Sequence, residues 1–157
     1  MESFSAAKKA DIMHQASTLY MSSNIPIDYG TGEEYTAVEV HLVEYIVDHP
    51  GKTVTELSRD FNKTKAAFSQ MLKKIEKKGL IEQREALDSK KKQLYYATEK
   101  GHELNTAHLR YDEQAFENTI EIMKDYCSEK DIEAGFRMLE SYVLARRNER
   151  YRSKEDK

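Results

Sequence analysis

The 157-residue sequence contains a single cysteine, two prolines, six glycines and no tryptophan. Cys127 alone cannot form an intramolecular disulfide or a cysteine zinc cluster. Apolar runs are too short to cross a membrane, and residues 1–15 lack the apolar stretch of a secretion signal. We therefore expect a small cytoplasmic protein that makes no membrane contact, with one domain and, at most, an added oligomerisation element.

Motifs that mark common enzymes are also missing. The sequence has no G-x-S-x-G, no Walker A loop, no G-x-G-x-x-G, and no zinc-hydrolase pattern of His-x-Glu followed by Cys-x-x-Cys. Serine and histidine residues do not occur in a recognisable catalytic arrangement. We expect a protein that is not an enzyme and that needs no cofactor.

Positive charge is concentrated in one window of an otherwise acidic chain. Between Lys52 and Lys92 there are twelve Lys/Arg and six Asp/Glu, a local balance of +6, whereas the whole chain carries −3. The residues outside this window therefore sum to −9. A basic segment in an acidic protein indicates a polyanionic partner, for which a phosphate backbone is the leading candidate.

Residues 53–79 show the pattern of two short helices joined by a polar turn. Thr53 and Glu56 have the spacing of a capping box, in which each side chain satisfies a free backbone N–H at a helix start. Thr64 is a second candidate N-cap, and Gly79 suits the left-handed position that ends a helix. Helical spacing separates an apolar face of the second helix from a polar one. The apolar face comprises Phe68, Met71, Leu72 and Ile75, and the polar face comprises Ala66, Ser69, Gln70, Lys73, Lys74 and Lys77.

After Gly79 the apolar period changes to that of strands. LIEQREA alternates, ALDSKKK has turn chemistry with three lysines, and QLYYAT is rich in strand-forming residues, so we expect a hairpin with a cationic tip. Thr98 is placed to cap the next helix. Two short helices followed by a basic hairpin are typical of a helix-turn-helix with a wing, whose second helix enters the major groove.

The run TVTELSRDFNKTKAAFSQMLKKIEKKGLIEQREALDSKKKQLYYATEKG resembles the winged-helix core of MarR-type transcriptional regulators. The family pattern includes a Ser/Thr-initiated recognition helix, L-x-x-x-G-L-[IV], a wing with Asp-x-Arg, and L-T-x-x-G. Three positions depart from it: Lys90 or Lys91 replaces the wing arginine, Ala97 replaces leucine, and Lys63 occupies a normally apolar site.

The resemblance implies a mainly α fold with a small β-hairpin wing, in which a winged helix-turn-helix core is flanked by N- and C-terminal dimerisation helices. We expect an N-terminal helix and connection over 1–34, the DNA-binding core over 35–98, dimerisation helices over 99–151, and a disordered tail over 152–157. The core should begin with a helix from about Thr36 to Asp48, where Thr36 and Glu39 repeat the capping-box spacing. Its apolar stripe is Val38, Leu42, Val43 and Ile46.

Apolar residues on the flanking helices favour a homodimer. The helix expected over 99–125 has apolar residues at helical spacing, namely Phe116, Ile120 and Met123. The helix expected over 129–150 follows a candidate N-cap at Ser128 and has the same pattern at Ile132, Phe136, Leu139 and Val143. Two long helices with such stripes outside a compact winged core need a partner surface, and a second copy provides it. Residues 5–21 are also expected to be helical, with Ile12, Ala16 and Leu19 on one side.

We thus predict a sequence-specific regulator, a ligand-responsive repressor that binds double-stranded DNA as a homodimer at a pseudo-palindromic operator. DNA contacts are expected on the recognition helix at Thr64, Lys65, Ala66, Ser69, Gln70, Lys73, Lys74 and Lys77, and on the wing at Arg84, Lys90, Lys91 and Lys92. A winged-helix protein-interaction module without DNA binding is the alternative from another class.

A small-molecule effector would bind between the dimer helices and the winged core. Candidate ligand residues there are Tyr35, His41, Tyr45, His108 and Tyr111. We expect no metal site, but zinc-sensing members of the resembled family use helix-borne histidines and carboxylates. His108 and Asp112 have the i, i+4 spacing of two ligands on one helix face, so a zinc-responsive regulator using His41, His108 and Asp112 stays open.

Overall fold

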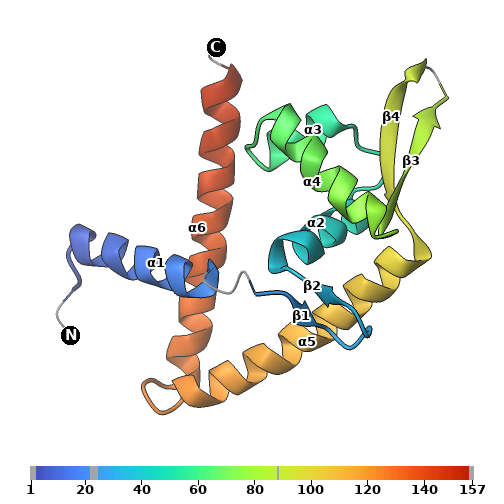
Figure 1. Ribbon diagram of the computed structural model, residues 1–157. Helices are drawn as coiled ribbons and strands as arrows, with labels where there is room; N and C mark the ends of the chain where they lie inside the picture. The colour runs from blue at the N-terminus through green and yellow to red at the C-terminus, as the bar shows by residue number, and fades with distance from the viewer. Residues whose placement is uncertain (1–2, 22–24, 88, 156–157) are drawn as a thin grey trace. The chain divides into compact units, whose positions relative to one another are not determined.

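A computed structural model describes residues 3–21, 25–87 and 89–155, except for the side chains of residues 20–21, 90–91 and 147–155. The chain divides into two compact units, Met1–Tyr111 and Asp112–Lys157. The elements along the chain (Figure 1) are α1 (Ala6–Met21), β1 (Ile27–Asp28), β2 (Glu34–Tyr35), α2 (Ala37–Asp48), α3 (Val54–Asp60), α4 (Lys65–Lys77), β3 (Ile81–Ala86), β4 (Ser89–Ala97), α5 (Glu99–Met123) and α6 (Glu129–Glu155). None of the described helices combines the length and the apolar character that a membrane span requires.

The first unit contains the predicted winged helix-turn-helix, in which three helices pack beside an antiparallel hairpin. Phe68, Leu72 and Ile75 of α4 are buried, so its apolar face points into the core as predicted, with Met71 half-buried at the edge. Tyr95 of β4 is buried and the following Tyr96 only half-buried, the alternation expected of a strand with one covered face. The mainly helical architecture with a hairpin wing is therefore confirmed.

Side-chain caps determine where the helices of this core begin. The hydroxyl of Thr36 accepts from the backbone N–H of Glu39, and the Glu39 carboxylate accepts from the N–H of Thr36 in return. Thr53 and Glu56 form the same reciprocal box at α3. These boxes satisfy backbone donors that have no partner inside the helix, and both were predicted from the sequence.

Backbone residues with positive φ shape the two ends of α4. Asn62, at φ 53°, turns the chain between α3 and α4, and asparagine is one of the few residues with a side chain that tolerates this region. Gly79, at φ 73°, follows the last helical turn, where its N–H donates to the Glu76 carbonyl and the next N–H, of Leu80, donates to the Ile75 carbonyl. This is a Schellman ending, and it directs the chain out of α4 into the hairpin.

The hairpin pairs β3 with β4 in a constant register from Ile81↔Ala97 to Glu85↔Gln93. The next pair is Ala86↔Ser89, so residues 90–92 form a bulge in β4. The three lysines therefore lie in β4, beyond the connection that follows Ala86, whereas the sequence placed them in the turn itself. In Figure 1 the hairpin extends away from α2 and α4, with the end of β3 and the start of β4 farthest from them.

A close contact between backbones joins the hairpin to α5. The Thr98 N–H donates to the Leu80 carbonyl (3.1 Å), and the Thr98 hydroxyl donates to the Gly79 carbonyl and accepts from the Gly101 N–H. A Cβ on Gly101 would lie 2.1 Å from the Leu80 carbonyl oxygen. Only glycine fits there, which gives the Thr-x-x-Gly motif its physical reason.

Two expectations in the first unit need correction. Val38 is 42% exposed, whereas Val40 is buried with Leu42, Val43 and Ile46. The buried face of α2 therefore extends to the side of Val40 and not to that of Val38. The segment before α2 was expected to be a plain connection. It forms a short ribbon instead, with β1 paired to β2 (Figure 1) and Tyr29 packed against the core.

The second unit contains the end of α5 and all of α6. Ser128 caps α6 as expected, because its hydroxyl accepts a hydrogen bond from the Asp131 N–H. The rings of Phe116 and Phe136 are in contact, with 5.6 Å between their centroids. Ile132 is buried, but much of the predicted stripe stays open to solvent, with Val143 44% exposed. α6 continues to Glu155, beyond the expected end at residue 150 and into the segment expected to be a disordered tail.

Candidate functional site

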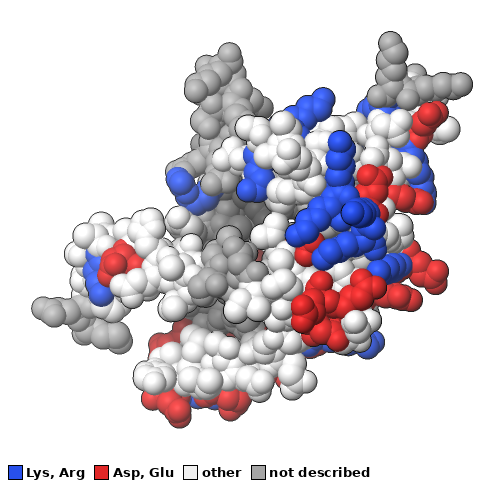
Figure 2. Space-filling model, in the orientation of Figure 1, with Lys and Arg blue, Asp and Glu red and all other residues white. Residues whose placement is uncertain are grey.

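α4 carries four of the eight cations predicted to contact DNA. Lys65, Ala66, Gln70, Lys73 and Lys77 are exposed on the side opposite the buried stripe. Figure 2 shows Lys and Arg side chains gathered over this helix, with acidic side chains over the β1–β2 ribbon beside it. Ser69, also expected on this face, is half-buried. Thr64 is the N-cap of α4, and its hydroxyl accepts a hydrogen bond from the Ala67 N–H.

A buried carboxylate holds two other lysines of this region in place. Glu39 Oε1 lies 3.2 Å from Lys74 Nζ and 2.9 Å from Lys78 Nζ, while its other oxygen closes the α2 cap. Burial alone would raise the pKa of Glu39, but the hydrogen bonds from the Thr36 N–H and from both lysines outweigh it and lower the pKa to about 2. Lys74 thus has a structural partner besides any phosphate, a role that the sequence did not indicate.

Lys52, the first cation of the basic window, is also occupied structurally. Its ammonium pairs with Asp60 and donates to the Tyr45 hydroxyl at 3.0 Å, and that hydroxyl donates to Asp60 at 2.9 Å. Burial alone would raise the pKa of Asp60, but the hydrogen bonds from Lys52 and Tyr45 lower it. The network ties the end of α2 to the end of α3.

The wing presents a mixed set of charges. Arg84 pairs with Glu82 and lies over the Tyr96 ring, 4.4 Å from its centroid, so its guanidinium is held along the strand. Lys92 is exposed, and the side chains of Lys90 and Lys91 lie outside the described residues. Among the described residues no carboxylate pairs with Lys63, Lys65, Lys73, Lys77 or Lys92, which makes these five the open cations of the winged core.

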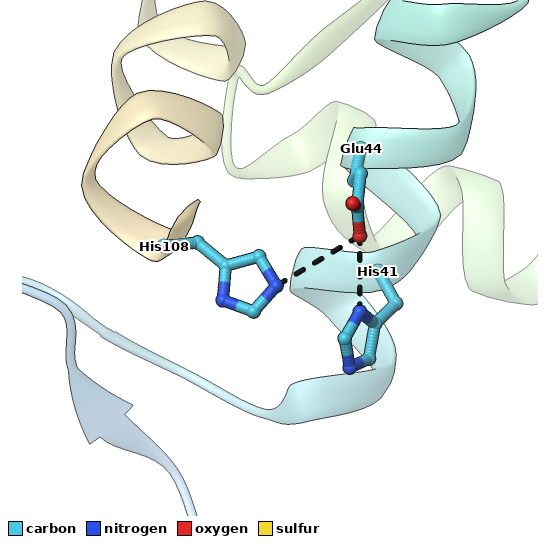
Figure 3. Close-up of side chains that lie close together, drawn as sticks. All are labelled: His41, Glu44 and His108. Atoms are coloured by element: carbon cyan, nitrogen blue, oxygen red, sulfur yellow. Dashed lines mark hydrogen bonds and ion pairs between the residues drawn. The ribbon is translucent and has the colours of Figure 1, made fainter. Parts of the chain in front are cut away.

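Two histidines and a carboxylate form a second cluster, between α2 and α5 (Figure 3). His41 Nδ1 lies 3.1 Å from Glu44 Oε2, and His108 Nε2 lies 3.8 Å from the same oxygen. One ligand atom from each of the three residues falls within 4.8 Å of the others, with His108 buried and the other two half-buried. Figure 3 shows one oxygen of the Glu44 carboxylate facing a nitrogen of each imidazole. Two imidazoles and one carboxylate are a donor set that suits a divalent transition metal.

The structure brings together some of the expected effector residues and separates others. His41 contacts His108 ring to ring at 4.9 Å, and Tyr29 links His108 with Tyr111 at 5.2 Å to each ring. Tyr45, by contrast, faces Asp60 and Lys52 in the network at the end of α3. Tyr35, the last residue of β2, is buried, and its hydroxyl donates to Glu33 at 2.8 Å.

Neither Glu44 of the histidine cluster nor Tyr29, which packs against His108, was predicted from the sequence. Glu44 lies three residues after His41 on α2, and this i, i+3 spacing was the available signal. Tyr29 lies in the β1–β2 ribbon, where no periodic pattern marks it. Asp112, expected as a ligand beside His108, belongs to the second compact unit and is outside the group of three.

Comparisons with known proteins agree on one fold. No curated protein sequence matches the chain. FabT from Streptococcus pneumoniae, solved in complex with DNA, aligns with a TM-score of 0.66 at 19% identity over 90% of this chain and 95% of that one. The regulator SlyA aligns with a TM-score of 0.66 at 22% identity over 94% and 97%. ZitR from Lactococcus lactis, a zinc-responsive MarR family member, gives 0.58 at 15% over 89% and 99%.

A family model matches the winged core of the chain. Residues 35–91 match the MarR family model, a segment that runs from just before α2 into the wing and includes the whole helix-turn-helix. The winged core is thus similar to that of the MarR family, and the chain has the winged-helix fold of the solved structures.

Proposed function

We propose that this protein is a sequence-specific DNA-binding transcriptional regulator, a repressor that binds a pseudo-palindromic operator as a homodimer. The observation that carries the proposal is the row of open cations on α4, opposite its buried stripe, in a chain whose net charge is −3. A helix docked by one face and basic on the other is suited to the major groove. The FabT structure in complex with DNA supports the same use of the fold.

Different residues of α4 would have different roles. Gln70 is exposed in the middle of the helix, and its amide offers the donor and acceptor that pair with adenine N6 and N7. Lys65, Lys73 and Lys77 would neutralise phosphates, which adds affinity without sequence information. Lys74 contacts Glu39, so its share in phosphate binding would be smaller than its position on the helix suggests.

Exposed apolar side chains on the flanking helices support the homodimer. In the second unit Met138, Val143 and Leu144 are 56%, 44% and 55% exposed, and on α1 Ile12 and Leu19 are 41% and 75% exposed. Covering such surfaces is favourable by roughly 25 cal/mol per Å² of apolar area, so a second copy of the chain is the partner we propose. A two-fold dimer would present its recognition helices to two half-sites about one helical turn apart.

The test begins with selection of bound fragments from genomic DNA, followed by affinity measurements on the selected site and on a random duplex. Gln70→Ala should lower affinity for the selected site by about ten-fold and change random-duplex binding less than two-fold, because a base contact contributes roughly 1–3 kcal/mol. Lys77→Ala should weaken both. Gln114→Ala, an exposed glutamine of the second unit, is the matched control and should change neither. Equal binding of Gln70→Ala and parent, or a selected site without two-fold symmetry, would contradict the proposal.

The histidine cluster favours a second candidate, a zinc-responsive regulator of the same fold. His41, Glu44 and His108 offer two nitrogens and an oxygen within 4.8 Å, and the zinc-responsive ZitR shares the fold. When bound, zinc would tie α2 to α5 through these three side chains. Equilibrium dialysis against metal-free buffer with added zinc should then retain about one ion per subunit, and His108→Ala should lose it. Absence of stoichiometric zinc would leave a small-molecule effector near His41, His108 and Tyr111 as the proposed signal.

A further inference from the structure

The tip of the wing carries an apolar side chain where turns usually carry a polar one. Leu87 is the first residue of the two-residue turn between Ala86 and Ser89. This residue is fully exposed to solvent, more so than any other large hydrophobic residue that the structure describes. Hairpin turns favour Gly, Asn and Asp, and a leucine held in water gains nothing from folding. The stability of the chain itself therefore does not explain Leu87.

The base of the hairpin is anchored, so the position of this tip is fixed relative to α4. The Tyr95 N–H donates to the Lys52 carbonyl (3.0 Å), and the Gly51 N–H donates to the Tyr95 carbonyl (2.9 Å). On the other strand the Gln83 amide donates to both carboxylate oxygens of Glu76, at 2.9 and 3.0 Å, which ties β3 to α4. A DNA duplex seated on α4 would consequently meet the wing at a defined place.

Cations lie behind the apolar tip along the hairpin. Lys92 is exposed in the bulge that follows the turn, and Arg84 lies over the Tyr96 ring nearer the base. An apolar end with positive charge behind it matches the side chains with which proteins enter the minor groove, where basic residues hold the backbone and a leucine or similar wedge unstacks a base step.

We propose that Leu87 inserts into the minor groove next to the segment that α4 occupies and opens one base step there. This inference rests on the proposed DNA binding and adds a specificity that needs no hydrogen bond to a base. Pyrimidine–purine steps such as TA and CA/TG unstack most easily, so the operator should carry one of them where the wing tip meets it. The kink would bend the duplex toward the major groove.

The experiment compares three variants of the full chain on the selected operator and on a random duplex. Affinity is measured by fluorescence anisotropy over a range of salt concentrations, and bending by energy transfer between dyes at the two duplex ends. Leu87→Ser should weaken operator binding by about ten-fold, change random-duplex binding less than two-fold, leave the salt slope unaltered and reduce the bend. Leu87→Met, which retains an apolar side chain, should bind within about two-fold of the parent.

Lys92→Ala is the matched control, since it removes a cation from the same wing. It should weaken both duplexes and reduce the salt slope by about one unit per lost contact per subunit, with the bend retained. Operator binding and bending by Leu87→Ser at parental level would overturn the wedge, as would equal losses on both duplexes. If the parent binds no duplex with salt-dependent affinity, the proposed function itself fails, and the wedge with it.

Discussion

Replacing Glu39 with glutamine isolates the charge of the carboxylate that joins α2 to α4. Glutamine has nearly the volume of the protonated acid and retains an oxygen for the Thr36 N–H, but it cannot pair with Lys74 and Lys78. The pKa of Glu39 falls from 4.5 to about 2 on folding. At 1.36 kcal/mol per unit, this difference corresponds to about 3 kcal/mol of stability that the charged form contributes at pH 7.

The sign of the pH dependence follows from the direction of the shift. Because folding lowers the pKa, the contribution is complete above pH 4.5 and is lost as the pH falls toward 2. Urea unfolding at one protein concentration should therefore show Glu39→Gln less stable than the parent by about 3 kcal/mol at pH 7 and by about 2 kcal/mol at pH 3.5.

A control lies in the second capping box. Glu56 closes the α3 cap as Glu39 closes that of α2, but among the described residues no lysine or arginine pairs with it directly. Glu56→Gln should accordingly cost clearly less than Glu39→Gln at pH 7. Equal losses for the two variants, or a loss for Glu39→Gln that stays constant between pH 7 and pH 3.5, would refute the reasoning that the lysine contacts stabilise the fold.

Four further substitutions test other parts of the structure. Gly101→Ala should lower the free energy of unfolding by about 3 kcal/mol, because the new Cβ would overlap the Leu80 carbonyl. Gly135→Ala should raise it by about 0.5–1 kcal/mol, because this glycine lies inside α6 with open space around it. Denaturant titrations that give both changes the same sign would contradict the close contact at Gly101. Asp60→Asn should cost about 1–3 kcal/mol in the same titration, since it removes the charge that holds the α2–α3 network; a neutral result would mean that the network contributes no net stability. Val143→Asp should give a folded monomer in sedimentation equilibrium where the parent is a dimer at micromolar concentration, and a dimer at parental affinity would place the interface elsewhere.

The parts of the fold that the sequence predicted depend on local chemistry. The capping boxes at Thr36 and Thr53 and the left-handed Gly79 each satisfy backbone groups within a few residues, so their spacing is visible in the sequence. The buried face of α4 could also be predicted from local sequence. Its apolar residues lie on one side and its polar residues on the other, so only one face can pack against the core.

What the sequence did not predict depends on contacts between distant segments. Glu39 was recognised as a cap, but its ion pairs with Lys74 and Lys78 join two helices whose approach no local pattern encodes. α2 carries apolar residues on several sides, so periodicity alone could not decide between Val38 and Val40 as the buried residue. Glu44 belongs to the histidine cluster because α5 places His108 against α2, and this contact between distant segments is not encoded in the local sequence.

The bulge in β4 separates the length of the wing from the geometry of its base. Pairing from Ile81 to Glu85 keeps one register, and the irregularity falls entirely between that ladder and the turn. In an uninterrupted hairpin, inserting one residue would turn every following side chain to the opposite face. Here residues 90–92 already lie outside the ladder, so insertions or deletions at the tip would be absorbed there while Tyr95 stays buried. The reach of the wing is thus free to change without disturbing the core on which it stands.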